Sequence, residues 1–133
     1  MGKPAAKQGD RIKAVDTHTE MVPSGSGEQP QPVPGHNFDG AINGALISSV
    51  LIMDKPAAVK GSKSVGSMSH QPKVGSRFLL PPNNKGEIMA GSATVMIGGK
   101  PAARDGDLAQ TCDDVVPAPH GKVEAQGTVF IGG

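Results

Sequence analysis

The stretch TVMIGGKPAARDGD (residues 94–107) contains a motif that recurs in two separate pieces at the ends of the chain. The chain ends in GTVFIGG (127–133), which repeats the first half, and begins with MGKPAAKQGD (1–10), which repeats the second half. A further complete copy, SSVLIMDKPAAVKGSK, occupies residues 48–63. Internal repeats constrain a fold more strongly than local propensities do, so we take these copies as the starting point.

The first half of each copy predicts a short β-strand. Residues 48–54, 92–99 and 127–133 alternate apolar residues with a period of two and are bounded by Gly, Ser or Asp. The GGKP and DKP junctions predict tight turns. Each KPAA copy then has a Gly six residues after its Lys: Lys3 and Gly9, Lys55 and Gly61, Lys100 and Gly106.

The offset of the copies predicts a closed ring of three. The second and third copies are continuous, whereas the first has its KPAA at the N-terminus and its strand at the C-terminus. A ring that is cut at one seam explains this offset and requires the strand at 128–131 to lie beside residues 3–6. A linear solenoid with frayed ends is the alternative, but solenoid ends usually carry caps and none is visible.

The composition favours a thin fold. The chain of 133 residues has 19 Gly, 12 Pro and three Phe, with no Trp or Tyr, and large aromatic residues normally dominate a thick core. Disorder is the competing interpretation. Residues 22–40 (VPSGSGEQPQPVPGHNFDG) are predicted to form a long loop. Residues 39–49 are the best candidate for one or two turns of helix, although their two Gly weaken it.

Composition also excludes several classes of function. The formal net charge is +1, and the chain lacks the basic stripe and the aromatic residues of a nucleic-acid-binding protein. No apolar run approaches the roughly 18 residues that a membrane-spanning helix needs. The N-terminus lacks the apolar segment of a secretory signal peptide, so we expect synthesis in the cytoplasm. The single Cys excludes an internal disulfide.

Potential metal ligands recur at a similar phase in the three copies. His18 and His70 each lie fifteen residues after the Lys of a KPAA copy, and Cys112 lies twelve residues after the Lys of the third. In a ring of three, these side chains would converge near the axis. With a fourth ligand they would form a closed tetrahedral site, which suits structural Zn²⁺.

The residues leave the fourth ligand open between His36 and His120, each of which follows a Pro-rich stretch. The competing interpretation is that four His are ordinary and that a lone Cys is a small buried hydrophobe. Acidic neighbours oppose thiolate formation at Cys112, so a catalytic thiol is not predicted. Asp10 and Asp107 follow Gly at equivalent positions, where side-chain bonds to the backbone of a turn are expected.

Three ordered copies of Pro-Ala-Ala, one of them reading KPAARDGD, resemble the motif of the PAAR family. The pattern SATVMIGGKPAARDGD followed by TC is similar to the core of PAAR and PAAR-like proteins. The stretches DTHTEMVP, VPGHNFDGAINGAL and LLPPNNKGEIMAGSATVMIGG are similar to the PAAR-like branch found on contractile injection particles. The resemblance covers essentially the whole chain, but only Arg104 stands in a full Pro-Ala-Ala-Arg; the equivalent positions hold Lys7 and Val59.

The resemblance implies an all-β fold, a small pseudo-threefold β-helical cone or prism of short strands and long Pro/Gly-rich loops, built as one domain over residues 1–133. It implies one structural Zn²⁺ near the apex, held by three His and one Cys. Carried over by motif, the ligands are His18, His36, His70 and Cys112. No catalytic or other cofactor-binding residue is implied.

The function implied by the resemblance is mechanical and non-enzymatic. Such a protein caps and sharpens a trimeric spike of the VgrG or phage-baseplate type, in type VI secretion, extracellular contractile injection or phage-tail-like particles. It would aid membrane puncture, touch the target membrane only transiently, and have effector cargo as a further partner. We expect assembly at the tip of a particle that is secreted, released or fired. The repeats extend from Lys3 to Gly133, so no effector extension is expected. A small zinc-dependent enzyme and a free-standing metal-binding module are the alternatives.

Overall fold

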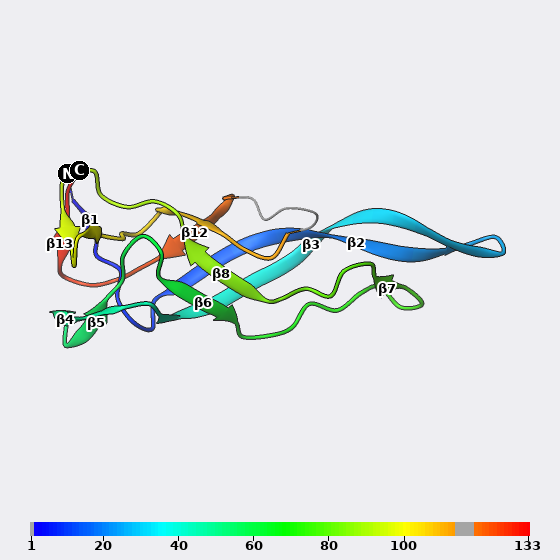
Figure 1. Ribbon diagram of the computed structural model, residues 1–133, viewed down its shortest axis with the longest axis horizontal. Coiled ribbons are helices and arrows are strands. Elements are labelled where there is room, and N and C mark those ends of the chain that lie inside the picture. Colours follow the sequence, from blue (N-terminus) through cyan, green and yellow to red (C-terminus); the bar gives the residue numbers. More distant parts are fainter. Residues whose placement is uncertain (1, 114–118) are drawn as a thin grey trace.

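The fold is built from β-strands. The computed structural model describes residues 2–113 and 119–133, and within these ranges there are thirteen strands and no helix (Figure 1). No helix in the described ranges is therefore long and apolar enough to cross a membrane. The prediction of an all-β fold is confirmed. The helix expected at residues 39–49 is wrong: this stretch belongs to two strands, and its two Gly, which disfavour a helix, lie in a strand instead.

The longest element is an antiparallel hairpin of β2 (Arg11–Ser24) and β3 (Gly27–Gly44). It runs along the long axis of the molecule, and its turn forms one end (Figure 1). Gly25 has a φ of 56° at the first central position of this two-residue turn, as in a type II′ turn. The loop predicted at residues 22–40 is therefore wrong. The prolines are tolerated because this part of β3 is an edge strand.

The other half of the hairpin belongs to a closed sheet. In strand order, β12, β11, β8, β6, β3 and β2 are neighbours, and β2 pairs back with β12. The core inside this sheet holds Phe38, Ile12, Ile42, Ile88 and Val123, all at most 2% exposed. A further strand, β7, pairs with β2 nearer the hairpin turn. Besides β2 and β3, the strands of this sheet are β6 (Lys63–Gly66), β7 (Arg77–Phe78), β8 (Lys85–Ile88), β11 (Leu108–Gln110) and β12 (Gly121–Glu124).

Three two-stranded sheets occupy the end where the chain termini lie (Figure 1). In each, the Lys-Pro of one KPAA copy pairs with the apolar strand of the same copy. The pairs are β1 (Lys3–Pro4) with β13 (Phe130–Ile131), β5 (Lys55–Ala57) with β4 (Ile47–Ile52), and β10 (Lys100–Pro101) with β9 (Met96–Ile97). Lys3 lies opposite Ile131, which confirms the predicted contact between the two ends of the chain.

The three KPAA copies bond to one another in a cycle. The amide of Ala6 donates to the carbonyl of Ala103 (2.9 Å), Ala103 donates to Ala58 (3.1 Å), and Ala58 donates to Ala6 (3.0 Å). All three residues are fully buried. A linear solenoid would leave two of the copies unpaired at its ends, so the ring is closed. The finer prediction of a pseudo-threefold cone or prism stays a prediction, because the three hairpins that follow the KPAA copies differ in length.

The turn after each KPAA copy is held by a short polar side chain. The predicted turn roles of Asp10 and Asp107 are confirmed, and Ser62 takes the same role in the second copy. The bonds run from the amide of Lys7 to Asp10 Oδ2 (3.0 Å), from Val59 to Ser62 Oγ (3.0 Å) and from Arg104 to Asp107 Oδ2 (2.7 Å).

Cationic side chains hold the C-terminal segment at the seam of the ring. Arg104 Nη1 donates to the carbonyl of Gly132 (3.2 Å), and Lys7 Nζ donates to the carbonyl of Gln126. The residue at the equivalent position of the second copy is Val59, which carries no charge. The cations thus stand in the first and third copies, which flank the seam.

Replacement of the seam cation, Arg104→Val, should lower the free energy of unfolding by about 3 kcal/mol, because it leaves Asp107 buried without its charged partner. Amide hydrogen exchange in β1 and β13 should also become faster. The matched control is Arg104→Val with Asp107→Ser, which copies Val59 and Ser62. It should recover most of the stability but not the slow exchange. Equal stability of the single and double variants would contradict this account.

Candidate metal centre

A β-bulge places His36 inside the molecule. Asp16 lies opposite His36, and His18 lies opposite Val33, so two residues of β3 stand opposite a single residue of β2 at Pro34 and Gly35. Gly35 has a φ of 94°, the conformation that a Gly in such a bulge adopts. Before the bulge the one buried residue of β3 is Val33, and after it the buried residues are the even-numbered Phe38, Gly40 and Ile42. Without the extra residue, His36 would face solvent.

The structure brings together the four residues that the resemblance predicts as ligands. The ring centroids of His18, His36 and His70 lie 4.9–5.3 Å from one another. Cys112 Sγ lies 3.7 Å from His18 Nε2. The ring of His36 faces a carboxylate, with its Nε2 3.0 Å from Glu20 Oε2. These side chains come from β2, from β3 and from the segments that follow β6 and β11.

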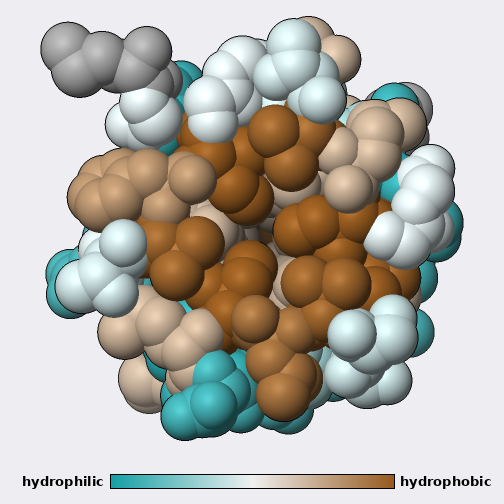
Figure 2. Space-filling model, turned by 90° about the vertical axis from the view of Figure 1, so that its left-hand side faces the viewer, coloured by the Kyte–Doolittle hydropathy of each residue, from teal (hydrophilic) through white to brown (hydrophobic). Residues whose placement is uncertain are grey.

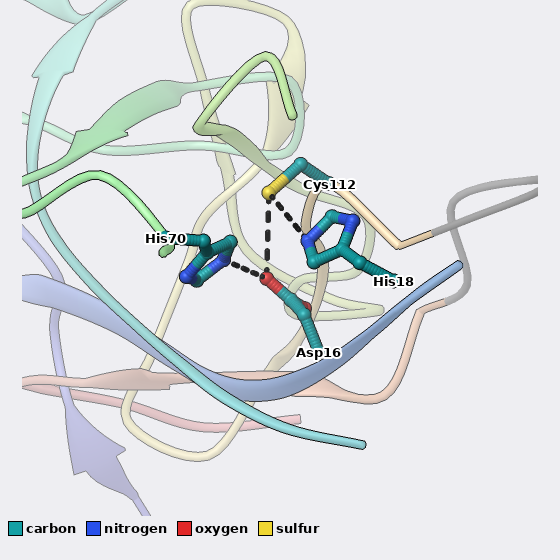
Figure 3. Close-up of side chains that lie close together, drawn as sticks. All are labelled: Asp16, His18, His70 and Cys112. Carbon is teal, nitrogen blue, oxygen red and sulfur yellow. Dashed lines mark hydrogen bonds and ion pairs between the residues drawn. The ribbon is translucent and has the colours of Figure 1, made fainter. Parts of the chain in front are cut away.

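Asp16 is a further candidate ligand that the sequence analysis missed. Its Oδ2 lies 3.0 Å from His70 Nε2 and 3.4 Å from Cys112 Sγ. One ligand atom from each of Asp16, His18, His70 and Cys112 lies within 4.8 Å of the others (Figure 3). The available signal was the spacing in DTH, since residues two apart on a strand face the same side.

Two buried carboxylates make the site favourable for a cation. Asp16 and Glu20 are fully buried, and each faces a histidine, His70 and His36 respectively. In the described part of the chain, neither forms an ion pair with Lys or Arg. Buried charges require compensation, which a divalent cation at the three imidazoles and the thiol would supply. A carboxylate on one ring nitrogen also orients the other nitrogen for a metal.

The thiol is poorly suited to nucleophilic catalysis. Burial, and to a lesser extent the negative charge of Asp16, raises the pKa of Cys112 to about 12. The thiol is therefore protonated at neutral pH unless a metal displaces the proton. A reactive cysteine needs the opposite environment, one that stabilises the thiolate.

His120, the alternative fourth ligand, is not a member of the group of close ligand atoms formed by Asp16, His18, His70 and Cys112, although its Nε2 lies 3.6 Å from Asp16 Oδ1. Its side chain is 40% exposed, and its Nδ1 is 2.9 Å from Asp113 Oδ2. Its Nε2 is 2.8 Å from the carbonyl oxygen of Val15. It shares a second group of close ligand atoms with Asp16 and Asp113 instead. His36 as the fourth ligand stays a prediction, because Asp16 offers an oxygen within the first group.

The donor set fits Zn²⁺. Imidazole and thiolate are the ligands that Zn²⁺ prefers, and four protein ligands in a closed site are typical of a structural ion. His18, His70 and Cys112 would hold the ion with His36 or Asp16. All of these except His36 are buried, and the side chain of His36 is 11% exposed.

The comparisons with known proteins give one family. The family model of the PAAR motif matches residues 80–133. The matched range contains Arg104 and Cys112, whereas the three histidines of the site precede it. No curated protein and no solved structure matches the chain.

The purified protein should contain about one Zn²⁺ per chain, and Cys112→Ser or His70→Ala should remove most of it, because each deletes a donor of a four-ligand site. Metal analysis together with the absorption spectrum of the Co²⁺-substituted protein measures this. His120→Ala is the matched control and should keep the metal. Full metal content in the Cys112 and His70 variants would show that the site is wrongly assigned.

Substitutions of the two candidates for the fourth ligand, His36 and Asp16, should lower Zn²⁺ affinity to different extents. If His36 ligates and Asp16 only orients His70, Asp16→Asn should weaken Zn²⁺ affinity by about 10–100-fold, whereas His36→Ala should abolish stoichiometric binding. Competition with a chromogenic chelator measures both affinities. The reverse order of effects would assign the fourth position to Asp16.

Removal of the metal by a strong chelator should lower the thermal midpoint by roughly 10 °C or more, because a structural ion contributes folding free energy directly. Differential scanning calorimetry with and without added Zn²⁺ checks this. An unchanged midpoint in demonstrably metal-free protein would rule out a structural ion.

Proposed function

We propose that this chain, whose residues 80–133 match the family model of the PAAR motif, caps and sharpens the trimeric spike of a contractile injection machine. The observation that carries the proposal is the end of the molecule that holds the three two-stranded sheets. Apolar side chains gather at the centre of this end, and hydrophilic ones surround them (Figure 2). A contiguous exposed apolar surface with a polar rim is typical of a protein–protein interface.

Three of the apolar side chains occupy equivalent positions. Leu51, Met96 and Phe130 each lie opposite the Pro of one KPAA copy, and their exposed fractions are 58%, 57% and 59%. The neighbouring Ile52, Ile97 and Ile131 face a small core below. A partner with threefold symmetry can meet all three positions with the same contact, which supports a trimeric spike.

The strands at this end also suit a partner that is itself made of strands. β4, β9 and β13 each have a single strand partner in the described ranges. Each therefore has one edge without a strand, and such an edge can accept an added strand. The hairpin turn of β2 and β3 lies at the opposite end of the long axis, and the candidate metal centre lies between (Figure 1). This arrangement supports a role in which the apolar end seats on the spike and the hairpin leads.

Under this proposal the protein is made in the cytoplasm and acts at the tip of an injection particle, where it helps to puncture a target membrane that it touches transiently. Attachment of effector cargo is a further role within the same proposal. The alternative of a zinc enzyme is less well supported, because the ligand group is buried and its thiol is protonated without metal.

A charge at the apolar end should weaken binding to the spike. Phe130→Glu should reduce affinity for the trimeric spike protein encoded nearby by at least about tenfold, because a buried anchor residue typically contributes more than about 1.4 kcal/mol. Binding of the purified spike is measured by calorimetry. The control is Val74→Glu, at a fully exposed apolar position outside this end. Equal loss of affinity in both variants, or in neither, would contradict the assigned surface.

A further inference from the structure

The hairpin carries an uncovered strand edge beyond the closed sheet. On its outer side β3 pairs with β6 only from Gly40 to Gly44. From Gly27 to residue 36 this side has no strand partner in the described ranges. Such an edge normally presents a row of amides and carbonyls that a second strand can pair with.

The direction of the main-chain groups follows from one hydrogen bond. The amide of Leu79 donates to the carbonyl of Thr19 (2.9 Å), so the main-chain groups of Thr19 point away from β3. Pro32 lies opposite Thr19 and belongs to the same non-hydrogen-bonded pair, so its nitrogen points away from β2. The alternation of an antiparallel ladder gives Pro30, opposite Met21, the same direction.

In all four prolines of this part of the hairpin, the main-chain nitrogen points away from the partner strand. Pro34 lies two residues beyond Pro32, and Pro23 lies two residues beyond Met21 on the other strand. On β3 this removes the donor at three successive outward positions, 30, 32 and 34. The intervening residues Gln29, Gln31 and Val33 direct their amides toward β2.

The outward direction of the proline nitrogens alone has a trivial explanation, since a proline whose nitrogen pointed inward would remove a hydrogen bond within the hairpin. The need to keep the bonds within the hairpin does not explain why there are so many prolines. Proline is disfavoured in strands, so three at successive outward positions of one strand are unusual. They leave carbonyls at the uncovered edge without any intervening donor, so two copies of this edge cannot form a ladder with each other.

We propose that Pro30, Pro32 and Pro34 close the outer edge of β3 to strand addition by a second copy of this chain. A second copy is the relevant partner because it presents the same edge, and two such edges would pair about a twofold axis. The net charge of +1 provides little repulsion between copies. The device keeps the projecting hairpin from pairing edge to edge.

The test is the triple variant Pro30→Thr, Pro32→Thr and Pro34→Thr, which restores three outward donors with a strand-favouring residue. Its mass relative to wild type is measured by sedimentation velocity over a hundredfold range of concentration. The expected result is a concentration-dependent rise to about twice the wild-type mass or more, with slow amide exchange at positions 30, 32 and 34. The matched control, Gln29→Thr with Gln31→Thr, raises strand propensity without adding outward donors and should keep the wild-type mass.

An unchanged mass in a triple variant that keeps its metal and its cooperative unfolding would overturn the proposal. So would an equal rise in the control. If the triple variant loses its metal, the single variant Pro32→Thr decides: a rise in mass above the control supports the proposal, and the mass of the control overturns it. None of these outcomes depends on binding to a spike.

Discussion

The cycle of hydrogen bonds among Ala6, Ala58 and Ala103 is the interaction on which the rest of the structure depends. Because successive residues of an extended chain face opposite sides, the two alanines of each KPAA copy serve two cores. The second alanines pack in the core of the closed sheet, and the first ones, Ala5, Ala57 and Ala102, pack in the small core beneath the apolar end. The ring is thus a layer between the two cores. Because three main chains meet there, a side chain larger than Ala would have to displace a neighbour.

This layer of three KPAA copies explains how a chain with so few aromatic residues can fold. Only Phe38 among the three Phe lies in the core of the closed sheet, and apart from Cys112 the rest of that core is aliphatic. Farther along the hairpin, apolar side chains give way to the three imidazoles, and those of His18 and His36 pack edge-on against Phe78, with ring centroids 5.5 Å apart. A metal can stabilise this region where a hydrophobic core is too small to do so. Beyond it, β2 and β3 form a ribbon supported mainly by their own ladder.

The ring was predictable from sequence because repeats report it directly: the offset of KPAA and its strand already implies a seam. The hairpin over residues 22–40 was not predictable, because proline usually ends a strand, and the direction in which each proline nitrogen points is known only once the register of β3 with β2 is known. The inward direction of His36 depends on a one-residue bulge at Pro34 and Gly35. Asp16 was not predicted as a ligand, because it has no counterpart among the His and Cys that recur in the three copies. Its spacing from His18 indicates a shared face of the strand but not that the carboxylate is buried.

The two ends of the molecule differ in whether their strand edges can pair with another strand. At the apolar end, the strands that carry Leu51, Met96 and Phe130 each have one edge without a strand partner in the described ranges. At the hairpin end, one edge of β2 is covered in part by β7 and continues into Pro23, while the edge of β3 lacks donors at three successive positions. Strand pairing combined with apolar contact is favoured only where both are present. Under the proposed function, association would be directed to one end of the long axis, as a part that attaches by its base and presents its other end to solvent requires.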